Sequence, residues 1–468
     1  MKLTSRQKVQ LRRSRPFLLL AVLAVFGLPW VLLFKTGAQA RTQSARMDVA
    51  ADVFLSQIPQ QSQNDEANQF DRLAAQLGFV PNSADALVRV DMVAERDYRA
   101  IEGLLNEFLT SQLAKTTGPL EALPAELNDY LIKYEVALAA LQAHLIDQPA
   151  PLWDVNLELM SEIGYASPGF INVLNTQKLL LLLAVSHGQD ADANLMLQAM
   201  EASWILNESV SKQPDLVSQL LVSLTAEQQS GLLRHMEGLP ATWQAKWQTR
   251  LSDRNRIAGF VGSSTFKTSS RQPPERSITS GLQFDAWLQY KMLQRSLLSP
   301  TARLSNNRLT STVSYWFSPV YYFSLSNLDT YTTSQRAIEI LKTLDVCKTT
   351  QADVEQQISE EKTAAWNSNR LPVETLARRW KEAGDRALAL ELTQKVLMAK
   401  QMQQDRESPL ALPNLNSDVC PGESWIYERT DDGAIAFSFS AEVTSQSKVP
   451  LSYRLPAATR LALDSFLD

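Results

Sequence analysis

Hydrophobic residues recur three and four positions apart along most of the chain, the spacing that places them on one face of an α-helix. The stretch 64–77 is typical, since Phe70, Leu73 and Leu77 share one face of a helix. Gly78 follows, and glycine is the common residue just beyond a helix C-terminus. The pattern predicts a helix at 64–77 and is typical of a mainly α-helical protein.

Two longer helices are expected next. Ser83 is suited to cap a helix that runs to about residue 115, where Thr117-Gly118-Pro119 interrupts the pattern. Pro124 then stands at a first-turn position, which proline tolerates. The apolar side chains that follow it are spaced by three and four and define a buried seam: Leu127, Leu131, Tyr134, Leu138, Leu141 and Leu145. We expect an antiparallel helical partner for this seam.

The stretch 170–185 contains five consecutive leucines, residues 179–183, and resembles a membrane span at first sight. It is too short to cross a bilayer and includes polar residues such as Asn175. We therefore expect a helix buried on most sides inside the protein, with Asp190 or Asp192 starting the next helix.

Two separated segments of the chain are similar to each other. Aligning Gly188 with Gly384 superposes three further pairs: Leu180 and Leu376, Ala193 and Ala389, Met200 and Val396. This spacing resembles the helical hairpins of tetratricopeptide repeats, in which a small residue permits a tight turn and alanine permits close helix approach. The resemblance implies stacked α-hairpins and assigns no binding residue.

The chain changes character twice in its second half. Residues 263–281 are rich in serine, threonine and proline without an apolar period, which favours a flexible linker. Helical spacing then returns. Apolar and polar residues alternate at 425–429 and 435–439 around Asp431-Asp432-Gly433, which predicts a β-hairpin. Residues 450–456 are expected to add one short strand.

We therefore predict a mainly α protein, with an N-terminal transmembrane or signal segment, antiparallel solenoid-like helical hairpins and a small C-terminal β-hairpin. With 468 residues, of which 45% are apolar, the chain is long enough for more than one core. The expected units are a basic tail and signal anchor at 1–40, an N-terminal helical domain at 41–262, a linker at 263–281, a second helical region at 282–408 and a β-containing region at 409–468.

The first forty residues have the features of an export signal. Six Lys and Arg residues precede the uncharged run 16–34, and only Lys35 follows it closely. This asymmetry keeps the N-terminus in the cytoplasm and sends the rest of the chain across the membrane. A helix over this run would be about 28 Å long, close to the thickness of the hydrocarbon core. We expect a single-pass anchor in the inner or plasma membrane and an extracytoplasmic body.

Cleavage of the leader is the open alternative. Residues 36–40 supply a small-x-small cleavage site, and Gly27 and Pro29 weaken a spanning helix. The protein would then be secreted after cleavage near residue 40. Arg12-Arg13 also resembles a twin-arginine signal, although the hydrophobic pair of that pattern comes too late here.

Composition and motifs exclude several classes of function. Beyond residue 40 the chain holds 38 Lys and Arg against 50 Asp and Glu, so we expect no nucleic-acid partner. With 16 glycines and none of the usual phosphate-loop, zinc or nucleophile motifs, the sequence assigns no catalytic residue, metal or cofactor. His144, His187 and His235 are isolated from one another. A hydrolase that uses two facing carboxylates stays open, because no linear spacing reveals such a pair.

Six aromatic residues lie within nine positions and form a candidate interaction surface: Tyr315, Trp316, Phe317, Tyr321, Tyr322 and Phe323. The simplest interpretation is a plug of core between helices. The functional alternatives are a hydrophobic groove for a partner and a belt at the membrane interface, since Tyr and Trp combine an apolar ring with a polar tip.

Cys347 and Cys420 are the two cysteines of the chain, and we expect them to form a disulfide in an oxidising compartment. Together these features predict a membrane-anchored, exported helical interaction module of the cell envelope, with a protein partner, rather than an enzyme. One alternative is an exported hydrolase with carboxylates in a cleft between the helical halves. The other is a carrier for an apolar ligand, which depends on the aromatic run.

Overall fold

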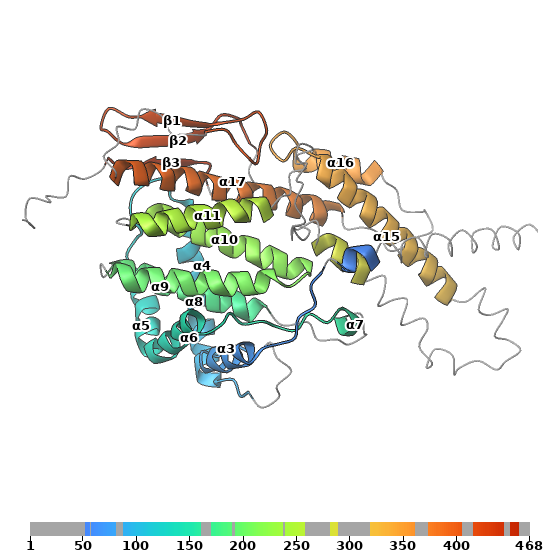
Figure 1. Ribbon diagram of the computed structural model, residues 1–468, viewed down its shortest axis with the longest axis horizontal. Helices are drawn as coiled ribbons and strands as arrows, with labels where there is room; N and C mark the ends of the chain where they lie inside the picture. The colour runs from blue at the N-terminus through green and yellow to red at the C-terminus, as the bar shows by residue number, and fades with distance from the viewer. Residues whose placement is uncertain are drawn as a thin grey trace, which may run out of the picture.

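A computed structural model provides the structure of the protein (Figure 1). It describes residues 52–56, 58–80, 88–160, 170–189, 192–236, 239–257, 281–288, 319–360, 373–404, 415–443 and 450–457. The described part is mainly α-helical and carries a small antiparallel sheet near its C-terminal end, as the sequence predicts.

Helices of the first half pack around a large apolar core. Their bounds are α3 Asp65–Gln76, α4 Met92–Ala114, α5 Ala125–Lys133, α6 Glu135–Asp147, α7 Leu157–Met160, α8 Ile171–Gln189, α9 Ala193–Ser211, α10 Leu216–His235 and α11 Ala241–Ile257. The leucine-rich α8 packs along α9, and residues 179–185 of α8 are all buried. This confirms the expectation of a helix enclosed by protein.

The second half is built around one long helix, α17 (Val373–Gln404). A helix at 281–288, α15 (Pro319–Thr343) and α16 (Gln351–Glu360) precede it. Figure 1 shows α15 and α16 towards one end of the molecule and the sheet lying along α17.

The sheet has three antiparallel strands in the order β1 (Trp425–Arg429), β2 (Ile435–Phe439) and β3 (Ser452–Leu455). Tyr427 lies opposite Phe437, which in turn lies opposite Tyr453. The hairpin turn contains Gly433 at φ +81°, a conformation that glycine adopts without strain. The predicted hairpin and the added third strand are both confirmed.

The long helix α17 joins the two halves. Leu390 and Leu397 belong to the core of the first half, whereas Leu388, Leu392 and Val396 belong to a second core shared with the sheet, α15 and α16. Since α17 also packs along α10 and α11, its two faces are covered by different partners. The predicted domain boundaries stay predictions, and residues 263–280 of the expected linker lie outside the described residues.

Two expected helix bounds are wrong. The helix expected from Ser83 begins at Met92, because the Asp91 carboxylate caps it by accepting hydrogen bonds from the N–H groups of Val93 and Ala94. The single helix expected after Pro124 is interrupted at Tyr134, which separates α5 from α6. Its apolar seam is nevertheless buried at Leu127, Leu131, Leu138, Leu141 and Leu145.

The internal similarity is structural at one of its two sites only. Gly188 lies in the last turn of α8, just before the short connection to α9, as a helical hairpin requires. Gly384, by contrast, lies in the middle of α17, so the prediction of a hairpin turn at this position is wrong. Its missing side chain has another cause: a Cβ atom at this position would be 1.8 Å from Cγ2 of Val346. Gly384 permits close packing of the segment after α15.

Among the described helices, none combines the length and the hydropathy that crossing a bilayer requires. The predicted membrane segment, residues 16–34, lies outside the described residues, so the predicted anchor and its orientation stay predictions.

Candidate functional site

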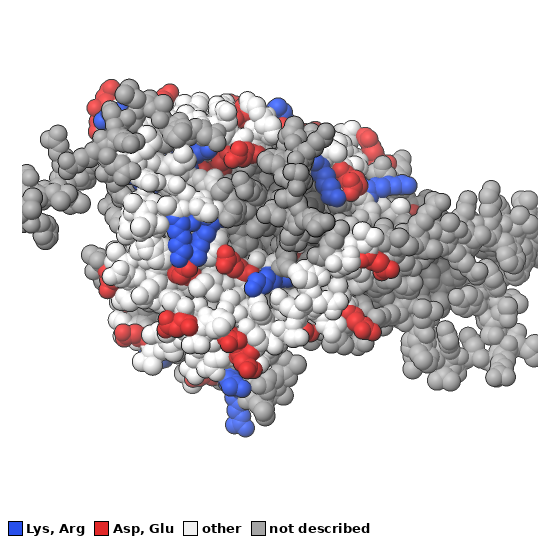
Figure 2. Space-filling model, in the orientation of Figure 1, with Lys and Arg blue, Asp and Glu red and all other residues white. Residues whose placement is uncertain are grey.

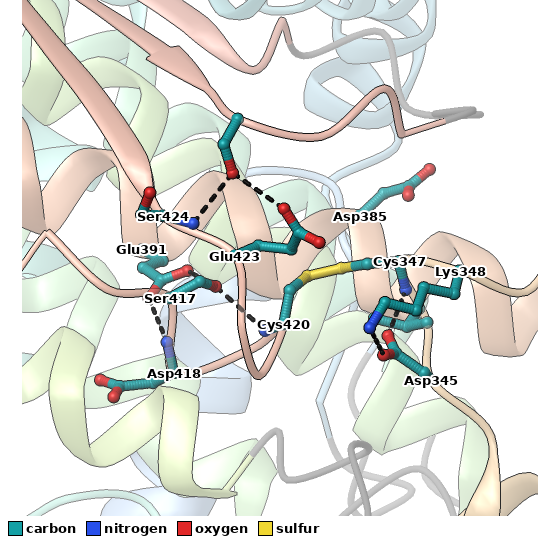
Figure 3. Close-up of a disulfide and its surroundings, with 12 residues drawn as sticks. Asp345, Cys347, Lys348, Asp385, Glu391, Ser417, Asp418, Cys420, Glu423 and Ser424 are labelled. Carbon is teal, nitrogen blue, oxygen red and sulfur yellow. Dashed lines mark hydrogen bonds and ion pairs between the residues drawn. A yellow bond between two sulfur atoms is a disulfide. The ribbon is translucent and has the colours of Figure 1, made fainter.

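The two cysteines form a disulfide that ties together distant parts of the second half. Cys347 lies in the turn after α15 and Cys420 in the loop before β1, 73 positions later, with their Cα atoms 5.9 Å apart. Figure 3 shows the bond crossing between these segments beside α17. Cys420 is buried and Cys347 is half-buried. The predicted pairing is confirmed.

A carboxylate on α17 holds the loop that carries Cys420. Glu391 accepts hydrogen bonds from the Ser417 hydroxyl at 2.7 Å and from the Asp418 N–H at 2.6 Å. The Ser417 hydroxyl oxygen in turn accepts from the Cys420 N–H at 3.0 Å (Figure 3). Burial raises the pKa of Glu391, and these donors act against that rise. These hydrogen bonds hold the loop on α17 in addition to the disulfide.

The turn that carries Cys347 is held in the same way. The Asp345 carboxylate accepts from the Cys347 N–H at 2.9 Å. Lys381 of α17 donates from Nζ to the Val346 carbonyl oxygen at 2.7 Å and lies 3.8 Å from an oxygen of Asp385. Burial lowers the pKa of Lys381, while Asp385 favours its charged form. The disulfide thus joins two segments that each dock on α17.

A second unusual feature is a buried polar interface between α10 and α17, which we call the polar seam. It comprises Glu227, Ser230, Arg234 and His235 on α10 with Arg386, Thr393 and Lys400 on α17. Arg386 Nε is 3.2 Å from Oε2 of Glu227, and Thr393 donates to the Ser230 carbonyl at 3.3 Å. Buried helix pairs are usually apolar, so this composition needs an explanation.

The C-terminus of α10 is satisfied from two sides. Lys400 Nζ donates to the carbonyl oxygens of Arg234 and Met236, both at 2.7 Å. The Tyr453 hydroxyl of β3 also donates to the Arg234 carbonyl, at 2.8 Å. A cation at the carboxyl end of a helix stabilises the exposed carbonyl groups and the helix dipole. These contacts couple α10, α17 and the sheet.

His235 is neutral in this environment. Its Nδ1 lies 2.9 Å from the Gly118 carbonyl oxygen and its ring packs edge-on against Tyr453. Burial lowers the pKa of His235 to about 4, with Arg234, Lys400 and Lys115 contributing repulsion. Since a carbonyl oxygen only accepts, Nδ1 carries the proton and Nε2 is an acceptor.

Two carboxylates meet at the opposite end of α10. Asp215 caps the helix by accepting from the Ser218 N–H at 2.9 Å, and Asp285 of the 281–288 helix accepts from the Leu216 N–H at 3.3 Å. Burial raises the pKa of Asp285 to about 7, and repulsion by Asp215 adds to the rise. A carboxyl group with this pKa exchanges protons near neutrality.

The candidate aromatic surface is not placed as a unit. Tyr321, Tyr322 and Phe323 belong to the first turns of α15, but their side chains are not described, and Tyr315, Trp316 and Phe317 lie outside the described residues. No group of three or more metal-ligating side chains occurs within the described ranges. On the face shown in Figure 2, basic side chains lie beside acidic ones over the described surface.

Sequence reasoning missed the polar seam and the Asp215–Asp285 pair. A signal for the seam existed, because five of the six residues at 225–230 of α10, all except Ala226, are polar and yet continue a helix between apolar turns. The carboxylate pair had no such signal, since its members are 70 positions apart. Comparisons with family models, curated proteins and solved structures find no match for this chain.

Proposed function

We propose that this protein is an exported, membrane-tethered helical scaffold of the cell envelope that binds a protein partner. The observation that carries the proposal is the Cys347–Cys420 disulfide, because such bonds form and persist in oxidising compartments outside the cytoplasm. It is the structural counterpart of the basic leader and the apolar run 16–34, which predict export.

The architecture supports a scaffold. Short connections join α8 to α9 and α9 to α10, so these helices stack as successive antiparallel neighbours (Figure 1). Stacked helical hairpins of a solenoid-like array present extended surfaces to partners. In the second half, the disulfide and the contacts of Glu391 and Lys381 hold the connecting segments rigidly on α17. A rigid frame lowers the entropic cost of binding.

Protease treatment of spheroplasts tests the export part of the proposal. The body is expected to be digested from outside while the protein stays in the membrane fraction. Full protection of the body in intact spheroplasts, with digestion only after lysis, would contradict export. A mature N-terminus at Arg41 would replace the anchor by a cleaved signal and leave the orientation intact.

The aromatic run is the proposed partner-binding segment. Trp316→Ala and Tyr322→Ala are expected to lose the same cross-linked partner in the envelope, because buried Trp and Tyr anchors dominate binding energy at interfaces. Val136→Ala is the matched control, since Val136 is an exposed apolar residue on α6, 85% accessible. Retention of every partner by both aromatic variants, with folding intact, would remove this segment from the proposal.

A hydrolase is the second candidate, and the Asp215–Asp285 pair is the observation that favours it. The pair lies between α10 of the first half and the 281–288 helix of the second, and Asp285 has the raised pKa of a general acid. Turnover of a glycan or peptide by the purified chain, lost in Asp285→Asn and kept in the exposed control Asp129→Asn, would establish this function. If the purified chain turns over no glycan or peptide, the scaffold proposal stands and the hydrolase proposal fails.

A further inference from the structure

Arg234 is a buried cation whose side chain has no hydrogen-bond partner. Its exposed fraction is 1%, and none of its three side-chain nitrogen atoms finds an acceptor in the described part of the chain. Its backbone carbonyl, in contrast, is held by Lys400 and Tyr453. Burial lowers the pKa of Arg234 to about 10, which leaves the guanidinium charged at neutral pH. The helix is therefore fixed here while five N–H donors stay free.

Neighbouring charges do not neutralise this guanidinium. Glu227, two turns earlier on α10, attracts it electrostatically, but the Glu227 carboxylate already lies 3.2 Å from Arg386. Gly231 and Leu113 border the group: a Cβ atom on Gly231 would be 3.6 Å from Nη2 of Arg234 and 2.1 Å from Cδ2 of Leu113. Leu113 of α4 therefore borders the guanidinium with an apolar side chain.

Other buried charges of the region have compensation. Lys381 lies near Asp385, and Glu391 accepts from Ser417 and Asp418 while Lys395 lowers its pKa. Arg234, in contrast, is attracted only electrostatically by Tyr453 and Glu227, and its guanidinium has no acceptor in the described part of the chain. An uncompensated buried cation costs several kcal/mol, whereas a planar oxyanion matches the guanidinium fork with two parallel hydrogen bonds.

We propose that Arg234 is the anchor of a binding site for a small oxyanion, a carboxylate or a phosphate group, at the junction of α4, α10 and α17. The anion accepts from the guanidinium, whose planar fork matches two oxygen atoms of a carboxylate or a phosphate. Occupation links α10 to α17 and so stabilises the polar seam. This site is independent of the aromatic run and of export.

Equilibrium dialysis of the full chain in mild detergent, with labelled inorganic phosphate and labelled acetate at constant ionic strength, tests the site. We expect saturable binding of one anion per chain, weakened at least tenfold in Arg234→Met. Arg250→Met is the matched control, because both Nη atoms of Arg250 already donate to Glu201, and its anion affinity is expected to equal that of the wild type. Preference for acetate identifies a carboxylate ligand, and preference for phosphate a phosphate-bearing one.

Equal affinity in Arg234→Met and wild type, or no saturable binding to the wild type, would overturn the proposal. If Arg234→Met does not fold, Arg234→Lys keeps the charge without the planar fork and is expected to bind more weakly. In the wild type, the arginine Nε–H resonances provide an additional readout. One of them is expected to shift with added anion, and titration without any shift counts against the site.

Discussion

The pair α8–α9 and the pair α10–α17 are both buried helix interfaces, but they are stabilised differently. In the first, the run of leucines at 179–183 is buried. The missing side chain of Gly188 makes room for Met196, whose Sδ would lie 3.0 Å from a Cβ atom at position 188. In the second, the ion pair Glu227–Arg386 and the capping Lys400 connect the helices. In α8–α9, substitutions that keep the apolar volume are expected to cost little, because the attraction between apolar side chains is non-directional. In α10–α17, removing one charged side chain is expected to cost more, because the partner charge stays buried.

The difference shows where this fold is specified and where it is vulnerable. Apolar burial provides most of the driving force for folding, and the buried leucines of α8 contribute to it. The polar seam provides alignment, because the ion pair Glu227–Arg386 and the hydrogen bonds of Thr393 and Lys400 form in one register of α10 on α17. We therefore expect the seam, and the segments that dock on α17, to respond most to single substitutions, to reduction and to pH.

The largest effect is expected from removing the cross-link on the α17 side. Cys347→Ser with Cys420→Ser frees a loop of 73 positions, and loop-closure entropy gives a loss of up to about 4 kcal/mol in the free energy of unfolding. Urea denaturation of oxidised wild type and of the double variant measures it. A reducing agent should lower the free energy of unfolding of the wild type to that of the double variant. If the reducing agent also destabilises the double variant, the effect on the wild type does not come from the disulfide.

Breaking the ion pair of the polar seam is expected to cost about 3 kcal/mol. Arg386→Met removes the cation that lies 3.2 Å from the buried Glu227 carboxylate, whereas the double variant Glu227→Leu with Arg386→Met removes both charges and should recover most of the loss. The matched control in the apolar pair is Leu181→Met, expected to cost under about 1.5 kcal/mol. Additive single effects of Glu227→Leu and Arg386→Met would mean that the two side chains do not interact.

Acidification is expected to weaken the polar seam through His235. Its pKa is about 4 in the folded protein, below the ordinary value near 6.5, so the folded state resists protonation. The stability that His235 contributes is present above pH 6.5 and is lost as the pH falls towards 4, on the order of 3 kcal/mol. His235→Gln should flatten this part of the stability–pH curve. An unchanged slope would assign the acid sensitivity to other groups.

The smallest effect is expected at the N-terminus of α9, in the apolar pair. Asp192 accepts a hydrogen bond from the Leu195 N–H at 3.0 Å and caps the helix. Asp192→Ala is expected to cost about 1 kcal/mol, and Asp192→Asn much less, because asparagine also caps well. Thermal unfolding of both variants measures the difference. Equal losses would indicate that the charge of Asp192, rather than its hydrogen bond, matters.

Sequence periodicity predicted the parts of the fold that depend on local signals. Phe70 and Leu73 with Gly78, the leucines of α8 and the hairpin turn at Gly433 all carry such signals. Gly384 was misjudged, because a glycine that ends a hairpin and one that admits Val346 against a continuous helix have the same local sequence context. Only the tertiary structure distinguishes them.

The candidate sites were harder to predict than the fold. The cysteine pair followed from there being two cysteines and an export leader. The polar seam arises from residues of α10 and α17 that lie more than 150 positions apart, such as Glu227 and Arg386. Nothing in a local pattern tells that a polar helix will be enclosed rather than exposed, because burial is decided by which elements pack on it.

The redox state of the two cysteines in the cell is the most direct test of an exported, disulfide-locked body. Cells are quenched with acid, free thiols are alkylated with one reagent, and the protein is reduced and alkylated with a second before mass spectrometry of the membrane fraction. We predict that Cys347 and Cys420 carry only the second label. First-label modification of both cysteines in the quenched membrane fraction would contradict the disulfide in the cell and with it the proposal of export.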